Sequence, residues 1–473
     1  MKNYFLIFSS ALFFLSSGTT QAQVVSKSTV EDQTGVEVTV YNSNLGLIKD
    51  IRSVQFSVGE GELRFMDIAA SVMPETVHVK SLNFPDQLTV LEQNYEYDLM
   101  NQTKLLDKFV GKQIKIIDVK EFQDRKDIIE ATLLSNNDGQ VYKINNEIYL
   151  GHPGIKVLPE IPGNLIATPT LAWHYENKST APHDIEVSYL TQNISWKADY
   201  VLVLNQEDSQ ADLSGWVTID NQSGTVYRNA GLKLVAGEVN RVQPAYQEKY
   251  MMAAAPMAES RASQFEEKSF FEYHIYDLQR KTTIKDREIK QINLLEANAI
   301  PIQKEFVVQG VSYYLTSFYG GQIPKQPVNV YIKFKNSKEN KVGIPLPAGI
   351  MRLYKKDNEG KLQFAGEDRI EHTPKEEEVR LKIGEAFDLV AERKQTDFKQ
   401  VTTQSFESEW EIVLRNHKEE DVTVSVVEPL LGQWQVLSQS HDFIKKDAST
   451  IQFDVSVPKD GETKITYRVR IGI

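Results

Sequence analysis

Apolar and polar residues alternate along most of the chain. The segments 36–40 (VEVTV), 185–189 (IEVSY) and 451–457 (IQFDVSV) place apolar side chains on one face only, which is typical of half-buried antiparallel strands. Turn sequences such as Asn137-Asp138-Gly139 separate these segments, as expected for hairpins. The pattern predicts a mainly β, multi-domain protein of antiparallel β-sandwiches with immunoglobulin-like modules.

One short helix interrupts this pattern, between residues 98 and 110. Asp98 is a capping residue type, Leu106 and Val110 recur near the helical period, and Gly111 is placed to end the helix. About five short strands are expected over 112–158. This segment is a candidate for a small SH3-like barrel.

Two stretches of biased composition indicate domain boundaries. Residues 159–163 (PEIPG) are typical of a linker, and residues 251–258 (MMAAAPMA) lack both periodicity and charge. We therefore expect the following segments: an N-terminal β domain at 30–97, the helix and barrel at 98–160, a sandwich at 165–242, a flexible linker at 243–268, a sandwich at 269–400 and a C-terminal immunoglobulin-like sandwich at 405–473.

A weak repeat supports the sandwich modules. A strand, a polar turn containing asparagine and a second strand occur in that order around Asn177, Asn336 and Asn416. Asparagine suits such a turn because its side chain bonds nearby backbone and tolerates a positive φ. Repeated modules and convergent hairpin chemistry both explain this recurrence.

The N-terminus has the composition of a secretory signal peptide. Lys2 supplies a positive charge, Tyr4–Leu15 supplies an apolar run, and Thr20-Gln21-Ala22 is a small-x-small ending, so cleavage is expected after Ala22. The alternative, a transmembrane anchor, is disfavoured because a span needs about 20 apolar residues. The expected location is the periplasm or the cell exterior.

The net charge and the absence of cysteine limit which partners and which kinds of site the chain can have. The 473 residues include 53 basic and 65 acidic ones, for a net charge of −12, which disfavours nucleic acid and anionic membrane surfaces as partners. The chain has no cysteine, which excludes a lipoprotein anchor, a thiol nucleophile, disulfides and thiolate metal sites.

Several motifs resemble one bacterial family. The segments 194–200 (ISWKADY), 215–224 (GWVTIDNQSG), 230–237 (AGLKLVAG), 271–276 (FEYHIY) and 366–370 (GEDRI) resemble the core signature of an uncharacterised domain-of-unknown-function family that includes mucoidy inhibitor A-like proteins. The resemblance extends from residue 177 to the C-terminus, and 36–81 resembles an associated N-terminal β domain. Many relatives carry a long coiled coil where this chain has residues 98–160. The resemblance implies a β-rich exported protein and supplies no catalytic residues.

Titratable residues offer few candidates for catalysis or metal binding. His174 and His183 flank one expected hairpin beside Glu176 and Asp184, which permits a metal site, although surface histidines are favoured. His274 lies among apolar residues and is expected to be a core histidine.

Acidic residues of the signature segments are the other chemical candidates. Asp220, Glu367 and Asp368 are candidate acids for glycoside hydrolysis. Residues 220–224 are favoured as a turn whose side chains bond the backbone, with Gly224 supplying an unusual φ.

Aromatic residues give the stronger indication of binding. Tyr313, Tyr314, Phe318 and Tyr319 precede two glycines, and exposed loop aromatics stack on sugars or anchor partners. The alternative is that they plug one end of a sandwich.

We expect an exported, non-catalytic β-sandwich protein of the cell envelope, which is structural or binds a glycan or a protein. We expect no cofactor, metal, nucleic acid partner or transmembrane span. The alternative is a hydrolase of envelope polysaccharide or peptide that uses Asp220 and Glu367.

Overall fold

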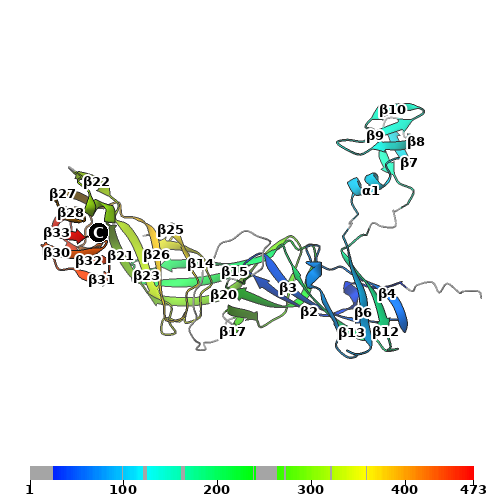
Figure 1. The fold of residues 1–473 in the computed structure, drawn as a ribbon, viewed down its shortest axis with the longest axis horizontal. Helices are drawn as coiled ribbons and strands as arrows, with labels where there is room; N and C mark the ends of the chain where they lie inside the picture. The colour runs from blue at the N-terminus through cyan, green and yellow to red at the C-terminus, as the bar shows by residue number, and fades with distance from the viewer. Residues whose placement is uncertain are drawn as a thin grey trace, which may run out of the picture. The chain divides into compact units, whose positions relative to one another are not determined.

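The computed structural model describes residues 25–97, 100–120, 125–160, 166–237, 239–240, 264–270, 273–319, 322–357 and 359–472. These residues are mainly β-strand, in several sheets (Figure 1), which confirms the expected fold class. The expected signal peptide with Ala22 and most of the expected linker lie outside the described residues. Backbone contacts divide the chain into unit 1, Met1–Val36 with Lys49–Tyr189, and unit 2, Glu37–Ile48 with Leu190–Ile473.

Unit 1 contains a four-stranded sheet in the order β1-β4-β12-β6. Its strands are β1 (Val25–Ser28), β4 (Gly59–Met66), β12 (Thr170–Asn177) and β6 (Leu88–Glu96). The β1–β4 pair is parallel, and the others are antiparallel. Strand β13 (His183–Thr191) pairs with β5 (His78–Ser81). Two 3-10 helices, η1 (Val30–Asp32) and η2 (Pro74–Thr76), complete the connections.

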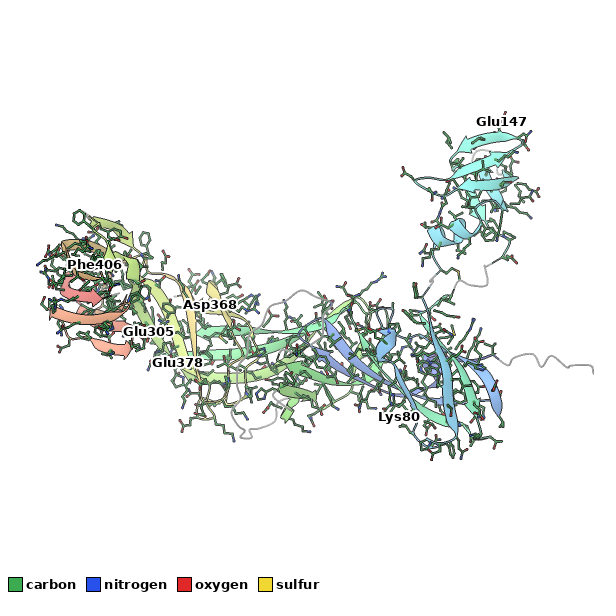
Figure 2. All side chains as sticks on the ribbon, in the orientation of Figure 1. Lys80, Glu147, Glu305, Asp368, Glu378 and Phe406 are labelled. Carbon is green, nitrogen blue, oxygen red and sulfur yellow. The ribbon has the colours of Figure 1, made fainter. Side chains whose placement is uncertain are left out.

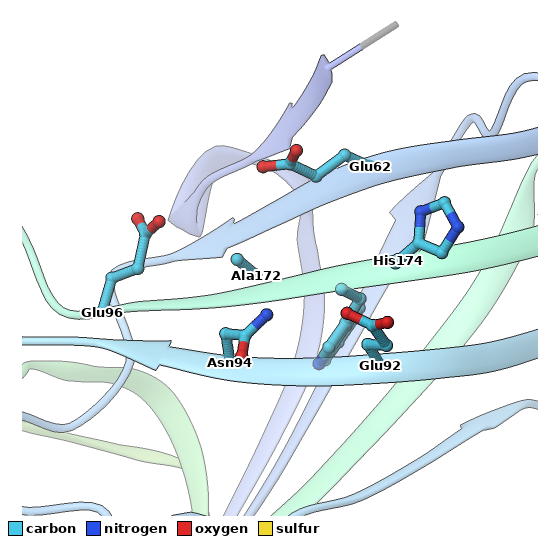
Figure 3. Close-up of a pocket in the computed structure, with 7 residues that line it drawn as sticks. Glu62, Glu92, Asn94, Glu96, Ala172 and His174 are labelled. Carbon is cyan, nitrogen blue, oxygen red and sulfur yellow. The ribbon is translucent and has the colours of Figure 1, made fainter. Parts of the chain in front are cut away.

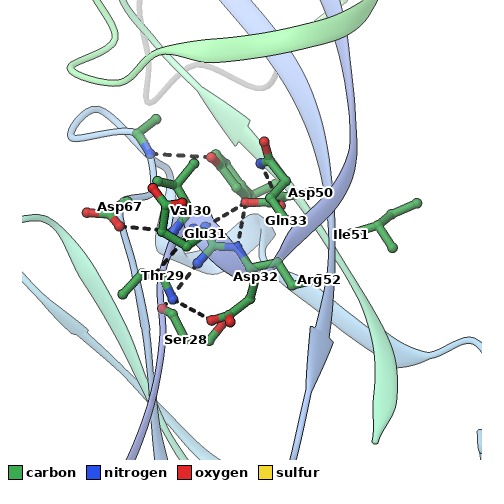
Figure 4. A network of polar contacts seen from close by, with 12 residues as sticks. Ser28, Thr29, Val30, Glu31, Asp32, Gln33, Asp50, Ile51, Arg52 and Asp67 are labelled. Atoms are coloured by element: carbon green, nitrogen blue, oxygen red, sulfur yellow. Dashed lines mark hydrogen bonds and ion pairs between the residues drawn. The ribbon is translucent and has the colours of Figure 1, made fainter.

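A buried arginine links the strands at one end of unit 1. Arg52 lies on β3 (Leu45–Val54), is fully buried, and donates to Asp50 at 2.7 Å and to the carbonyl of Ser28 at 3.2 Å. Its guanidinium lies 3.7 Å from the ring centroid of Phe65. Gln33, on β2 (Gln33–Tyr41), donates to the other oxygen of Asp50 (Figure 4). Every ionised atom therefore has a partner, as a buried ion pair requires.

A small domain is inserted between β6 and β12. Its five strands have the order β10-β9-β8-β7-β11, with the bounds β7 (Gln113–Lys120), β8 (Arg125–Ser135), β9 (Val141–Ile144), β10 (Glu147–Leu150) and β11 (Ile155–Val157). Among the described residues this sheet is open, which corrects the expected barrel. Leu106 and Phe109 pack into its core.

The helix is shorter than the sequence pattern indicates. Helix α1 spans Gln102–Lys108, and its N-cap is Asn101, whose side chain accepts from the Lys104 N–H at 2.9 Å. Asp98, the expected cap, lies outside the described residues. Gly111 follows the helix with φ +82°, a conformation that favours glycine.

Unit 2 begins with strands drawn from distant parts of the chain. One five-stranded sheet has the order β20-β15-β14-β24-β25, with β14 (Ile194–Leu204), β15 (Gln210–Asn221), β20 (Glu288–Pro301), β24 (Gly349–Lys356) and β25 (Leu362–Ile370). Strand β16 (Tyr227–Ala236) pairs with β18 (Tyr273–Leu278), β19 (Thr282–Ile284) and, in parallel, with residues 37–41 of β2. β17 (Phe265–Phe270) pairs with β18, so residues 265–268 of the expected linker are strand.

Two further sheets of unit 2 form a C-terminal sandwich. The first has the order β26-β23-β21-β29-β32-β31 and the second β22-β27-β28-β33-β30. The first comprises β21 (Gln303–Gln309), β23 (Asn329–Lys335), β26 (Glu378–Glu385), β29 (Val422–Pro429), β31 (Ile444–Asp447) and β32 (Thr450–Val457). The second comprises β22 (Gln322–Gln326), β27 (Leu389–Thr402), β28 (Ser405–Asn416), β30 (Gln433–Gln439) and β33 (Gly461–Gly472). Trp410, Phe453 and Tyr467 contribute to one core shared by both sheets.

A buried ion pair crosses this core. Arg393 on β27 donates to both carboxylate oxygens of Glu428 on β29 and to the hydroxyl of Tyr467 on β33. Burial opposes the charge of Arg393, but the Glu428 carboxylate outweighs it, so the pKa of Arg393 is raised. The pair ties the two sheets together in one register, because either charge alone would be costly to bury.

The sandwiches do not follow the sequence boundaries. β28, at the start of the expected 405–473 domain, pairs along its length with β27, and β29 pairs in parallel with β21. Strands from residues 303–335 and 378–402 therefore share one sandwich with those from 405–472, while β24 and β25 belong to the preceding sheet. The break at 400–405 is a hairpin turn between β27 and β28. Turn-forming residues occur both in hairpins and at domain boundaries, so composition alone does not distinguish the two.

Buried asparagines end four of the strands. Asn177, Asn221, Asn336 and Asn416 are the last or next residues of β12, β15, β23 and β28, and all four are essentially buried. Each side-chain amide donates to two or three backbone carbonyls of neighbouring turns. The expected strand, asparagine turn and second strand are present at Asn177 and Asn416. At Asn336 the turn is present, but the expected second strand at 341–344 is not a strand.

Candidate functional site

The acidic candidates do not meet. Glu367 on β25 is linked by strand register through Arg352 and Val201 to Ser214 on β15. Asp220 lies six residues further along β15, so about 20 Å of strand and three strand spacings separate it from Glu367. Glu367 pairs with Arg352 at 3.2 Å, and Asp220 accepts from the side chain of Gln222. They do not form a catalytic carboxylate pair.

Residues 220–224 form the turn that the sequence predicts. Asn221 accepts from the backbone N–H and hydroxyl of Ser223, and it donates to the carbonyls of Thr225 and Lys285. Gly224 has φ +86°, which favours glycine. The signature segment therefore has a structural role at this point.

His274 is a half-exposed member of an ion pair rather than a core residue. Its Nδ1 lies 2.8 Å from Glu267 Oε1 on the neighbouring strand, and Lys375 lies 3.5 Å from the same carboxylate. The hydrogen bond from His274 lowers the pKa of Glu267 against the opposing effect of burial, and Lys375 adds to the lowering. The expectation of a core histidine failed because β18 runs near the edge of its sheet.

His174 and His183 have different environments. His174 is half-exposed on β12 and points to the face opposite the buried Trp173 and Tyr175, as the alternation predicts. His183 is fully buried on β13, which corrects its expected surface position. Among the residues that the structure describes, no three histidine or carboxylate side chains could jointly hold a metal ion.

His183 belongs to a serine–histidine–asparagine network. Its Nε2 lies 3.0 Å from Asn177 Oδ1, and its Nδ1 lies 2.9 Å from Ser81 Oγ. The Asn177 amide nitrogen already donates to three carbonyls, so Asn177 Oδ1 must accept and Nε2 must carry the hydrogen. Nδ1 is then an acceptor that the Ser81 hydroxyl shares with Asn83 Oδ1, which lies 3.2 Å from the same Oγ. Burial lowers the pKa of His183. Ser81 is itself buried, so this triad-like arrangement serves the fold and offers no nucleophile to a substrate.

A shallow hollow of about 420 Å³ lies on the outer face of the β4-β12-β6 sheet. Glu62, Glu92, Glu96 and His174 line it (Figure 3). Arg64 lies within 3.6 Å of Glu62 and 3.5 Å of Glu96. Arg64, on the same sheet, partly neutralises the carboxylates of Glu62 and Glu96. We therefore interpret the hollow as part of the charged outer surface of the sheet.

Aromatic rings, some exposed and some half-buried, gather at one end of the C-terminal sandwich. Phe318, in the segment that follows the 3-10 helix η4 (Ser312–Thr316), is 73% exposed and packs against Phe398, which stacks on Phe406. Tyr319 contacts Trp410, and its N–H donates to Gln395 at 2.8 Å. The side chains of Tyr313 and Tyr314 lie outside the described residues.

A cleft of about 610 Å³ opens between strands β30 and β31, at the free edges of the two sheets. Trp434 and Phe443 line it, with ring centroids 6.5 Å apart, and Lys445 Nζ lies 5.0 Å from the Trp434 ring. The indole N–H of Trp434 donates to the Ala448 carbonyl, which fixes the ring. Three glutamine side chains also line the cleft: Gln433, Gln435 and Gln439.

Both aromatic groups belong to the same end of one sheet. Phe406 on β28 pairs with Ile471 on β33, and Ile471 pairs with Trp434 on β30. Paired residues point to the same face of a sheet, and Ile471 is buried in the core. Phe406 and Trp434 therefore lie at the end of the core-facing side of this sheet, half-buried and two strand spacings apart, or about 10 Å. We call Phe318, Phe398, Phe406, Trp434 and Phe443 the aromatic end of the C-terminal sandwich; Figure 2 labels Phe406 there.

Sequence reasoning identified Phe318 and Tyr319 but missed Trp434 and Phe443. The segment 433–436 (QWQV) alternates like any half-buried strand, so only its position at a sheet edge distinguishes it. Two aromatic residues nine positions apart, one on β30 and one just before β31, give no local signal of a shared cleft.

These features define a class of protein before any comparison: a mainly β chain with sandwiches and a cluster of aromatic rings at one end of the last one. Residues 185–471, well over half of the sequence, match the family described as Domain of unknown function (DUF4139). The chain belongs to this family. A comparison with curated proteins finds no match. Within the described residues, no helix is long and apolar enough to cross a membrane.

Proposed function

We propose that this is an exported, non-catalytic protein of the cell envelope that binds a glycan chain at the aromatic end of its C-terminal sandwich. The observation that carries the proposal is the cleft between β30 and β31, where the half-buried rings of Trp434 and Phe443 lie beside Lys445 and Gln439. A sugar ring presents a face of C–H groups and a rim of hydroxyls. Aromatic rings contact such a face, and glutamine amides both donate to and accept from hydroxyls.

The chemistry of the cleft favours a glycan over a strongly charged ligand. Lys445 is the one charged side chain among the residues that line it, and it already lies over the Trp434 ring. Gln439 pairs with Tyr467 and therefore shares the face of Trp434, whereas Gln433 and Gln435 alternate with Trp434 and point to the opposite face of β30. Open clefts lined by aromatic rings with a few polar groups are typical of small-ligand and saccharide sites.

Export rests on the N-terminal sequence, and the envelope role rests on export together with the family match. Lys2, the apolar run Tyr4–Leu15 and the ending at Ala22 support secretion. A closer relationship to mucoidy inhibitor A-like proteins is part of the same proposal, and it rests on the signature segments. The separation of Asp220 from Glu367 gives no support to the alternative of a hydrolase.

The binding proposal is tested by affinity electrophoresis of the purified chain in gels containing soluble neutral polysaccharides, together with a glycan array. We expect at least one glycan to retard the protein. Trp434→Ala should weaken binding about tenfold or more, because a central aromatic anchor contributes about 2 kcal/mol. Trp434→Phe should retain most binding, since it keeps a ring face.

Trp216→Ala provides the matched control. Trp216 is 37% exposed on β15, away from the aromatic end, so its loss should leave retardation unchanged. Melting curves of all variants show whether they fold. Absence of retardation by every glycan, or an equal loss in Trp216→Ala and Trp434→Ala, would refute the proposal.

A further inference from the structure

The small domain has an apolar outer face in addition to its packed core. Ile128, Ile148 and Ile155 are 65%, 66% and 62% exposed, and Leu150 is 87% exposed. The opposite face is filled by α1 and the core cluster. Isolated exposed apolar residues are ordinary, but a contiguous group of them on one sheet face marks an interaction surface.

Strand register arranges these residues in two groups. Ile155, Ile117 and Ile128 are direct partners across β11, β7 and β8 and form one apolar row. Ile148 and Leu150 form the second group on β10, at the other side of the sheet.

A polar centre lies between the two apolar groups. Lys115 pairs in register with Glu130, two residues along from the row of isoleucines, and Lys143 pairs with Ile148. All three charged side chains are exposed. The face therefore has apolar residues on both sides of charges of opposite sign.

The charge distribution indicates which partner fits this face. Residues 100–160 contain nine basic and nine acidic residues, whereas the whole chain carries −12. Two copies that approach through the small domain therefore meet without net repulsion from it, while approach through the remainder opposes like charges. In a two-fold arrangement each apolar group meets an apolar group, and Lys115 faces the acidic side chains of the other copy.

We propose that the outer face of the small domain is the surface through which two copies of this chain form a symmetric dimer. The surface is defined by Ile117, Ile128, Ile148, Leu150 and Ile155, with Lys115 and Glu130 at its centre. This inference is independent of the glycan proposal, because it concerns a different domain and a different kind of partner.

Sedimentation velocity of the full purified chain over roughly 1–100 µM, a range that covers weak specific dimers, tests the proposal. We expect a concentration-dependent species of about twice the chain mass of 53.9 kDa. Ile128→Glu and Ile148→Glu should each raise the dissociation constant about tenfold or more, because each places a charge in an apolar contact. Ile289→Glu is the matched control, since Ile289 is 70% exposed on β20 of unit 2, and it should leave the dimer unchanged.

A charge exchange separates a specific interface from general stickiness. Lys115→Glu should weaken the dimer, because the centre then holds two negative side chains against the single positive charge of Lys143. The double variant Lys115→Glu with Glu130→Lys should restore it, with melting curves confirming that all variants are folded. A monomer throughout the concentration range, or a dimer that survives both isoleucine variants, would overturn the proposal.

Discussion

Complete burial turns His183 into a structural residue. The imidazole bridges Ser81 and Asn177, and Phe56 packs against it with ring centroids 5.3 Å apart. Both side chains that hydrogen-bond to the ring, Ser81 and Asn177, are neutral, so a proton on Nδ1 would place a positive charge in the core without an opposite charge among these partners. This buried site therefore requires the neutral ring.

This requirement predicts a loss of stability in mild acid. Burial lowers the pKa of His183 in the folded chain, while the unfolded chain keeps a value near 6.5. Between these values the unfolded state binds the extra proton, so the stability contributed by His183 is present above about pH 6.5 and falls as pH decreases. Calorimetry from pH 7.5 to 5.5 measures this effect. The melting temperature of His183→Gln, which cannot titrate, should fall less steeply with pH than that of the unmodified chain; equal slopes would contradict the prediction.

The burial of His183 was accessible from the sequence, but the network was not. His183, Ile185, Val187 and Tyr189 follow a two-residue period, which puts the histidine on the buried face of its strand. The partner Ser81 lies 102 residues away on β5. Alternation assigns a side chain to a face, whereas its partners depend on which strands pair.

At the scale of elements, the buried asparagines anchor the ends of strands. Asn416 donates to the carbonyls of Glu420, Val457 and Pro458 at 2.8, 3.2 and 3.1 Å and accepts from the Lys418 N–H at 2.9 Å. The side chain thereby joins the end of β28 to the end of β32. No other small side chain supplies both donors and an acceptor at one site.

Removing this anchor should be costly. Asn416→Ala leaves buried carbonyls without donors and should lower the free energy of unfolding of the C-terminal sandwich by about 3 kcal/mol. Asn416→Asp, which has the same shape but cannot donate when ionised, should be at least as damaging. Asn340→Ala is the matched control, since Asn340 donates to a single carbonyl at an exposed site, and its cost should stay below about 1 kcal/mol. Denaturant unfolding measures all three, and a cost of Asn416→Ala similar to that of the control would show that the anchor is dispensable.

Strands were predictable from alternation, and their partners were not. The expected strands at 36–40, 185–189 and 451–457 lie within β2, β13 and β32. Four parallel pairs, β1–β4, β2–β16, β14–β24 and β21–β29, join segments that are distant in the sequence. Such pairs have no turn signature between their strands. The aromatic end likewise depends on two antiparallel pairs, β28–β33 and β33–β30, whose strands are not consecutive in the sequence.

At the scale of the whole molecule, the small domain is an insertion into a hairpin. Glu96, at the end of β6, is the direct partner of Thr170, at the start of β12. The two chain ends of the inserted segment are also joined by a hydrogen bond from the Met100 N–H to the Ile166 carbonyl at 2.9 Å. The sequence indicated a boundary near 159–163 from its prolines, but it could not show that the domains on either side share a sheet. The insertion therefore contributes its own core and leaves the β6–β12 pairing intact.

The insertion predicts that the small domain can be removed cleanly. Replacing residues 97–169 with Asn-Gly joins Glu96 directly to Thr170 through a two-residue turn, which suits an antiparallel pair already in register. Because the cores of the small domain and of the β1-β4-β12-β6 sheet use different residues, the shortened chain should fold with a melting temperature within a few degrees of the original. It should also be monomeric in sedimentation velocity, since it lacks the proposed dimer face, and should keep any glycan retardation shown by the full chain.

The matched control replaces residues 88–169 and so removes β6 as well. This exposes the Trp173 side of the sheet edge and should yield insoluble or strongly destabilised protein. If the shorter replacement is as damaging as the longer one, the small domain is an integral part of unit 1 rather than an insertion.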